Sequence, residues 1–192
     1  MNADIDISNT VLRTEQLILR PWRQSDLEDL YAYASVDGVG QPAGWPPHTS
    51  LEVSQRILDH FIEGKKTFAI EYRGRAVGSV GIEHGGEVPP EFADKRCRSI
   101  GYVLAKDLWG RGLMPEAVRE VIRYCFEEAG LDALFCGHFL YNKQSERVQD
   151  KCGFRHYAFG TFETQLGTVE EHELRILTKE DWLRDLRKEA DA

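Results

Sequence analysis

Length, composition and charge already restrict what this chain of 192 residues can be. Its 42% hydrophobic and 29% charged residues are typical of a soluble globular protein that buries an ordinary core. The formal net charge of −8 argues against nucleic acid as a partner, because lysine and arginine drive binding to phosphates. No apolar run reaches the length of a membrane span and the N-terminus has no signal character, so we expect a cytoplasmic protein.

The chain is expected to form one main domain. The first ten residues are polar and expected to be loose, residues 11–178 form the domain, and residues 179–192 form a C-terminal helix and tail. Near the start, alternation around Leu17 and Leu19 predicts a strand over residues 14–21. A helix follows from about residue 25 to 35.

A long loop and a hairpin come next. Residues 37–50 are rich in glycine and proline, and loops of this length are more often functional than idle. Ser50 suits the N-cap of a second helix, and two strands over residues 67–72 and 76–83 flank a turn with Gly74. Residues 85–98 read as a second loop, either acceptor-facing or, as we favour, a solvated acidic face through Glu87, Glu91 and Asp94.

The segment from Trp109 to Gly130 joins a glycine turn to a strongly amphipathic helix, directly after a strand over residues 99–104. Gly110 and Gly112 let the backbone approach a ligand, and the free amides at a helix start attract anions. Pro115 suits the first helical position. This pattern predicts an anion site, although such a turn can also serve only to join a strand to a helix.

Two common nucleotide motifs do not fit this segment. A P-loop needs four residues between its glycines and then Lys-Ser or Lys-Thr, which the chain lacks. The dinucleotide fingerprint needs a third glycine where Pro115 stands. Later segments predict a strand over residues 133–140, a short helix after Asn142, two antiparallel strands over residues 155–164 and 168–177, and hence a mixed α/β sheet with helices on both faces.

Three motifs in order resemble the GNAT N-acetyltransferases. They are LRTEQLILRPWRQSDLEDLY from Leu12, WGRGLMPEA from Trp109, and YNKQSERVQDKCGFR from Tyr141. The first resembles the RimJ/RimL branch, the ribosomal-protein N-terminal acetyltransferases. The resemblance implies the GNAT fold, with a central mixed, mostly antiparallel sheet, and direct transfer of acetyl from acetyl-CoA to a primary amine in a ternary complex. A protein N-terminal α-amine is the first expectation, and a small-molecule amine is the alternative.

The resemblance also implies a set of coenzyme contacts. The pantetheine arm is expected along Tyr102, Val103 and Leu104, with the amide near Leu104 donating to the thioester oxygen. The pyrophosphate is expected in the loop formed by Trp109, Gly110, Arg111, Gly112, Leu113 and Met114. Asn142 and Ser145 are expected against the pantetheine, and either residue can instead cap the helix that follows.

The catalytic groups are less defined by pattern. Ser145 is the candidate donor to the coenzyme sulfur, and Glu83 and His138 are the candidate bases. A solvated strand-end carboxylate and a buried core histidine are the competing interpretations of Glu83 and His138. In the long loop, Trp45 and His48 are candidate acceptor contacts, but Trp45 can equally pin the loop and His48 reads more readily as solvated.

Two departures from the family pattern keep a silent acyl-CoA-binding or interaction module as an alternative. Asp107 stands where many members carry Gln or Arg, and Gln149 stands where many carry a catalytic tyrosine. The four cysteines show neither paired nor metal-ligand spacing, so we expect buried thiols, no disulfide and no metal. Either a monomer or a homodimer is compatible with the sequence.

Overall fold

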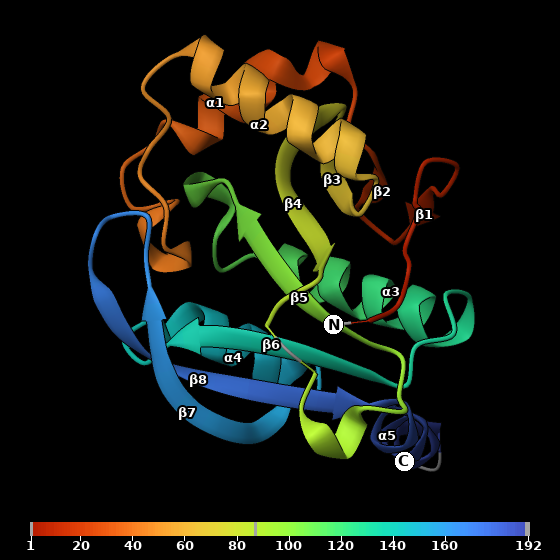
Figure 1. Ribbon diagram of the computed structural model, residues 1–192. Coiled ribbons are helices and arrows are strands. Elements are labelled where there is room, and N and C mark those ends of the chain that lie inside the picture. The colour runs from red at the N-terminus through yellow and green to blue at the C-terminus, as the bar shows by residue number, and fades with distance from the viewer. Residues whose placement is uncertain (1, 87, 191–192) are drawn as a thin grey trace.

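A single twisted sheet organises the computed structural model, which describes residues 2–86 and 88–190 (Figure 1). Glu87 of the expected acidic loop and the last two tail residues lie outside the described residues. The strand order is β1-β2-β3-β4-β5-β6-β8-β7, and of the pairings only β5 with β6 is parallel. The strands are β1 Leu12–Arg13, β2 Ile18–Pro21, β3 Thr67–Tyr72, β4 Arg75–Glu83, β5 Cys97–Leu104, β6 Ala133–Phe139, β7 Arg155–Glu163 and β8 Val169–Thr178.

In the described part of the chain, five α-helices cover this sheet, and the expected mixed α/β fold is confirmed. They are α1 Leu27–Ala34, α2 Leu51–Gly64, α3 Leu113–Glu127, α4 Lys143–Lys151 and α5 Lys179–Ala190. In Figure 1, α1 and α2 lie together beside β3 and β4, whereas α3 and α4 lie behind β5 and β6. Within the described residues, no helix combines the length and apolar character needed to cross a membrane.

The N-terminal segment differs from the expectation of a loose end. Ala3 and Ile7 are buried in the core, and the side chain of Asn2 bonds the backbone of Lys95 and Cys97. Ala3, Ile5 and Ile7 alternate with polar residues over only three positions, which is too short a pattern to predict this docking from sequence. The N-terminal residues therefore belong to the folded core.

The expected strand over residues 14–21 is in fact two short strands separated by a turn. Thr14 closes that turn by accepting the backbone N–H of Leu17 at 3.0 Å. The Glu116 carboxylate, in the first turn of α3, accepts from the Thr14 hydroxyl at 2.5 Å and from the Gln16 amide at 2.8 Å. A contact with a residue a hundred positions away thus breaks a strand that local alternation predicted.

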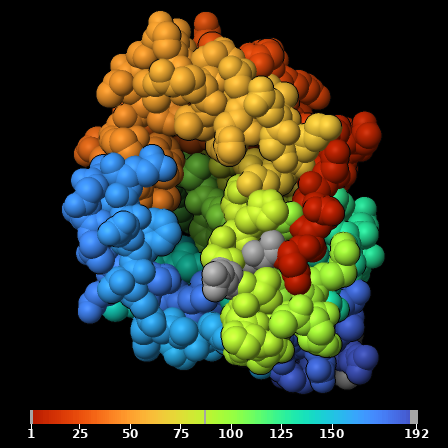
Figure 2. Space-filling model, in the orientation of Figure 1, coloured from red at the N-terminus to blue at the C-terminus, as the bar shows by residue number. Residues whose placement is uncertain are grey.

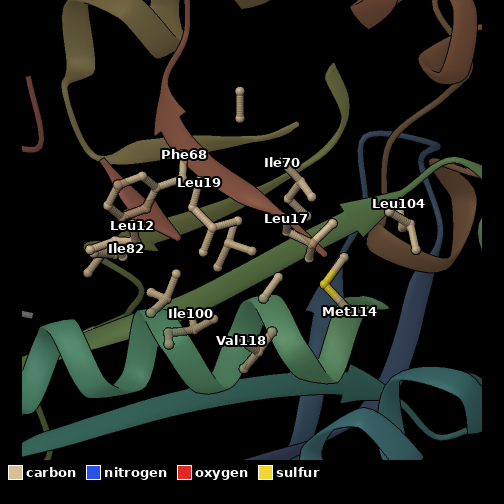
Figure 3. Close-up of a cluster of buried hydrophobic side chains, with 14 of the residues drawn as sticks. Leu12, Leu17, Leu19, Phe68, Ile70, Ile82, Ile100, Leu104, Met114 and Val118 are labelled. Carbon is tan, nitrogen blue, oxygen red and sulfur yellow. The ribbon is translucent and has the colours of Figure 1, made fainter. Parts of the chain in front are cut away.

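The packing of α3 against β5 holds the centre of the core. Ile100 and Leu104 of β5 lie close to Met114 and Val118 of α3, and all four are buried (Figure 3). The helix begins at Leu113 with Gly112 as its N-cap, so Pro115 is its third residue and not its first. All four cysteines are buried, as expected, and burial raises the pKa of Cys136 and of Cys152 to about 12.

Candidate functional site

A cavity of about 570 Å³ opens where β5 and β6 part. The two strands pair only from Cys97 to Ser99 with Ala133 to Phe135, so beyond Ile100 they diverge. Figure 2 shows the molecule hollowed between the β7–β8 hairpin, in blue, and the segment between α1 and α2, in orange, with green β5 behind them. The cavity wall includes the expected Tyr102, Val103 and Leu104.

The backbone of β5 directs N–H groups toward this cavity. Ala105 donates its N–H to the Val77 carbonyl of the β4 side at 2.8 Å. Because amide direction alternates along a strand, the N–H groups of Tyr102 and Leu104 point to the opposite edge, where β6 has parted from β5. Leu104 therefore offers the backbone donor that the resemblance implied.

The glycine loop closes one end of the cavity. Gly110 and Gly112 have φ of 77° and 81°, a left-handed conformation that favours glycine, and a Cβ at either would meet no atom within 4 Å. The N–H groups of Leu113 and Met114 are at the start of α3, so the helix itself supplies them with no acceptor. The loop is an open cradle of backbone donors for an anion.

Basic side chains lie at the same end. Arg147 and Lys151 of α4 line the cavity, whereas the expected contact Arg111 does not and donates to the Asp107 carbonyl at 3.0 Å. The side chain of Asp107 is exposed and outside the cavity lining. The negative charge that raised doubt about an anion site is thus directed to solvent.

Asn142 and Ser145 act together at the start of α4. Asn142 is the N-cap, accepting the Ser145 backbone N–H at 3.1 Å, and its Nδ2 donates to the Pro42 carbonyl at 3.1 Å. Ser145 is the third helical residue and not the cap. Its Oγ lies 2.8 Å from the Tyr102 hydroxyl and 3.3 Å from Nε2 of Gln149. Both Asn142 and Ser145 line the cavity.

His138 also contributes to the cavity wall, but it is 5% exposed and its ring is tied into a buried network. Its Nδ1 lies 3.0 Å from Oε1 of Gln149, and its Nε2 lies 3.5 Å from the Glu173 carboxylate. Burial is the main cause that lowers the pKa of His138.

His138, Glu146 and Glu173 offer ligand atoms within 4.8 Å of one another, the kind of cluster that can hold a metal. Arg175 contacts both carboxylates, at 3.1 Å from Glu173 and 3.7 Å from Glu146. A guanidinium thus already supplies the cation for this cluster. The expectation of no metal stays a prediction.

Besides Arg111, three predicted site residues lie outside the cavity lining. The Trp45 ring packs so closely over Gly40 that a Cβ at Gly40 would overlap the ring. Trp45 therefore pins the loop. His48 is buried and its Nδ1 lies 2.8 Å from the Ser54 hydroxyl, so the solvated interpretation is wrong. Glu83 forms an ion pair with Lys66 at 2.8 Å. The structure does not bring these three together with Ser145 and His138.

Sequence reasoning missed much of the cavity wall. The spacing of Gln144, Arg147 and Lys151 places them on one helix face, a signal that could have revealed them. No local pattern marks six further lining residues: Val39, Pro42, Ala43, Phe139, Phe162 and His172. His172 is notable because its Nδ1 is buried without a hydrogen-bond partner in the described part of the chain.

Comparison with known proteins identifies the fold and the family. A family profile described as an acetyltransferase (GNAT) domain matches residues 16–155, most of the chain. The chain belongs to the GNAT acetyltransferase family. The resemblance seen in the sequence is therefore confirmed, and the protein is an N-acetyltransferase of this family.

Curated relatives of this acetyltransferase are bacterial and fungal. The uncharacterized N-acetyltransferase YoaA of Bacillus subtilis is 28% identical over 153 residues, covering 76% of this chain and 82% of YoaA. The FsC-acetyl coenzyme A-N(2)-transacetylase of Aspergillus fumigatus is 35% identical over 101 residues, 51% of this chain. That match spans only 43% of the fungal protein's length.

Solved structures share the fold of this acetyltransferase. The ribosomal-protein-S5-alanine acetyltransferase from Vibrio fischeri superposes with a TM-score of 0.71 at 20% identity, over 91% of this chain and 99% of its own. The microcin C7 self immunity acetyltransferase MccE, solved with acetyl-CoA and AMP, gives 0.74 at 16% identity, over 91% and 99%. At identities this low, these superpositions establish a common fold only.

Proposed function

We propose that this acetyltransferase transfers the acetyl group of acetyl-CoA to the α-amine of a protein N-terminus, with both substrates bound together. One observation carries the choice of amine: in the described part of the chain, no aspartate or glutamate lines the cavity. An α-amine titrates near 8 and a lysine amine near 10.4, so the α-amine needs less help from a base.

The residues present fit acetyl-CoA, which would supply the activated acetyl group. The loop from Trp109 to Met114, with Arg147 and Lys151, would bind the phosphates. Tyr102, Val103 and Asn142 would hold the pantetheine arm in the gap between β5 and β6.

Three groups would assist the transfer. The Leu104 N–H would donate to the thioester oxygen, and the Ser145 hydroxyl would donate a hydrogen bond to the sulfur. His172, which lines the cavity on β8, would accept the proton of the attacking amine. We assign this role to His172 in place of Glu83 and His138, because Glu83 is paired outside the cavity and both ring nitrogens of His138 face protein groups.

A small-molecule amine is the second candidate acceptor. The name of the fungal relative describes transfer to an N(2) atom of FsC, whereas the Vibrio fischeri structure is named for ribosomal protein S5. An aromatic group at the cavity mouth, Phe139, Tyr141 and Phe162, would accommodate either kind of acceptor.

Binding and turnover test these proposals separately. Thermal unfolding with acetyl-CoA, and with ATP and NAD as controls, should show a rise in Tm specific to acetyl-CoA. Thiol release is then measured with Ala- and Ser-terminated peptides, the same peptides acetylated at the N-terminus and carrying an internal lysine, and small amines. Release that requires the free α-amine supports the proposal, release only with small amines favours the second candidate, and no release with any amine supports the silent module.

A further inference from the structure

The amide of Gln149 has a fixed orientation behind the cavity wall. The residue is 0% exposed, and its Nε2 donates to the Gly137 carbonyl at 3.1 Å as well as to Ser145 Oγ at 3.3 Å. A carbonyl oxygen can only accept, so the amide nitrogen must face Gly137 and the amide oxygen must face away from it. That oxygen lies 3.0 Å from Nδ1 of His138.

This orientation decides where His138 carries its hydrogen. Because Oε1 of Gln149 can only accept, Nδ1 of His138 must be the donor. Nε2 then bears the lone pair in the neutral ring, and it has no hydrogen-bond partner within the described residues. The charged groups facing the ring are Glu173, Arg175 and Glu146, and burial with the nearby Arg175 favours the neutral state by lowering the His138 pKa.

The Ser145 hydroxyl oxygen is held by the same network. It accepts from the Gln149 amide at 3.3 Å and lies 2.8 Å from the Tyr102 hydroxyl. Tyr102 has a single hydrogen and also donates to the Ser145 carbonyl at 3.2 Å, so that hydrogen is not reserved for Ser145 Oγ. Burial holds the pKa of Tyr102 well above its usual value and keeps that hydrogen in place. Because the Gln149 N–H occupies one lone pair of Oγ, the hydroxyl hydrogen of Ser145 is left to turn either to the Tyr102 oxygen or into the cavity.

We propose that His138 and Gln149 are positioning residues that aim the Ser145 hydroxyl at the sulfur of the coenzyme. The inference rests on the proposed function, in which Ser145 donates to that sulfur. In this arrangement His138 contributes a permanent N–H and exchanges no proton during turnover. A histidine that served as the base would instead need to gain and lose a proton in each cycle.

The tautomer can be measured without any activity. Nitrogen-15 NMR of histidine-labelled protein at pH 7.5, with His138 assigned through the His138→Asn variant, distinguishes Nδ1–H from Nε2–H. We expect the Nδ1–H form, unchanged by acetyl-CoA. An Nε2–H tautomer would overturn the inference, and this result is informative even if no amine is turned over.

Kinetics separate positioning from proton transfer through two substitutions at one site. The Asn side chain can place an N–H where Nδ1 stands, whereas Leu cannot. We expect His138→Leu to lower kcat about tenfold with an unchanged Kd for acetyl-CoA, because one hydrogen bond to a positioned group is lost. His138→Asn should recover most of that loss, with the pH profile of the wild type.

A double substitution completes the test. If His138 acts through Ser145, then His138→Leu should have no further effect on kcat in a Ser145→Ala background. A His138→Asn variant as slow as His138→Leu, or an additive effect in the double variant, would overturn the positioning role. If the wild type is active, either of these results would contradict the positioning role without contradicting the proposed acetyl transfer.

Discussion

The cavity has two ends of different construction. At the end proposed for the coenzyme, the strand β5, the glycine loop and the start of α3 follow one another directly in sequence, from Cys97 to Met114. At the end proposed for the acceptor, the wall comes from the loop after α1, the end of β6 and the β7–β8 hairpin, which are far apart in the chain. The first end is made mainly of backbone donors and the second mainly of side chains.

This difference teaches where sequence motifs are informative. Backbone donors require glycines and a helix start at fixed spacing, so a short contiguous motif encodes them. Side chains that converge from distant segments need no spacing rule at all. Substitutions at the two ends should therefore separate coenzyme affinity from acceptor chemistry.

The largest effect is expected at the acceptor end, from His172→Ala. Loss of a general base should lower kcat about 100-fold and leave the Kd for acetyl-CoA unchanged. Thiol-release assays measure kcat, and calorimetry measures the Kd for acetyl-CoA. His60→Ala is the control, because His60 is exposed on α2 and outside the cavity lining. An equal loss of kcat and of coenzyme affinity would place His172 at the coenzyme end instead.

The next effect is expected at the coenzyme end, from Gly112→Val. A β-branched residue at φ of 81° costs about 2 kcal/mol and distorts the cradle, so the Kd for acetyl-CoA should rise about 30-fold. Gly130→Val is the matched control, since Gly130 has φ of 68° but does not line the cavity. Both variants should lose stability, and only Gly112→Val should lose affinity in calorimetry. A control that weakens binding equally would contradict the cradle.

A smaller effect is expected from the paired substitution Arg147→Ala and Lys151→Ala. Removing two exposed cations from the coenzyme end should raise the Kd for acetyl-CoA about tenfold at low salt. The difference from the wild type should shrink as salt is added, because salt screens exposed charges. Arg13→Ala, on β1 and outside the cavity lining, removes one cation elsewhere and is compared with each single substitution as a control. Salt-independent weakening would argue against phosphate contacts.

The smallest effect concerns the loop at the acceptor end and its dependence on pH. Burial lowers the pKa of His48, so below about pH 6.5 the unfolded chain binds a proton that the folded chain does not. Stability should therefore be full above that pH and decline as pH falls toward the lower folded pKa. Urea unfolding between pH 7.5 and 5 measures this slope. His48→Asn should flatten it, and identical slopes would show that His48 does not contribute.

Much of the fold was readable in advance because its elements carry strong local patterns. The hairpin β3–β4 and the pair β7–β8 agree with prediction within about one residue at each end, and the helices α2 and α4 begin where Ser50 and Asn142 predicted. The failures occurred where distant contacts overrode local pattern. Glu116 converts a predicted strand into a turn between β1 and β2, and the docked N-terminal residues bury Ala3 and Ile7.

The candidate site divides in the same way. The motif residues Tyr102, Gly112, Asn142 and Ser145 were identified from sequence, and all of them line the cavity. His48 was misjudged because nothing in the loop sequence shows that Ser54 will receive its ring in the core. His172 was missed because one histidine in a mostly polar strand carries no distinguishing pattern.

The sequence by itself determined the family, much of the sheet and helix order, and the position of the glycine loop, because each depends on periodicity or on contiguous motifs. Only the tertiary structure decided that His138 and His172 line the cavity, that Glu83 is paired with Lys66, and how Gln149 joins His138 to Ser145. The physical reason is that hydrogen-bond partners and burial arise when strands far apart in the chain are brought together. The cavity lies where β5 parts from β6. The residues that line it come from segments far apart in the chain, so no single stretch of sequence contains them all.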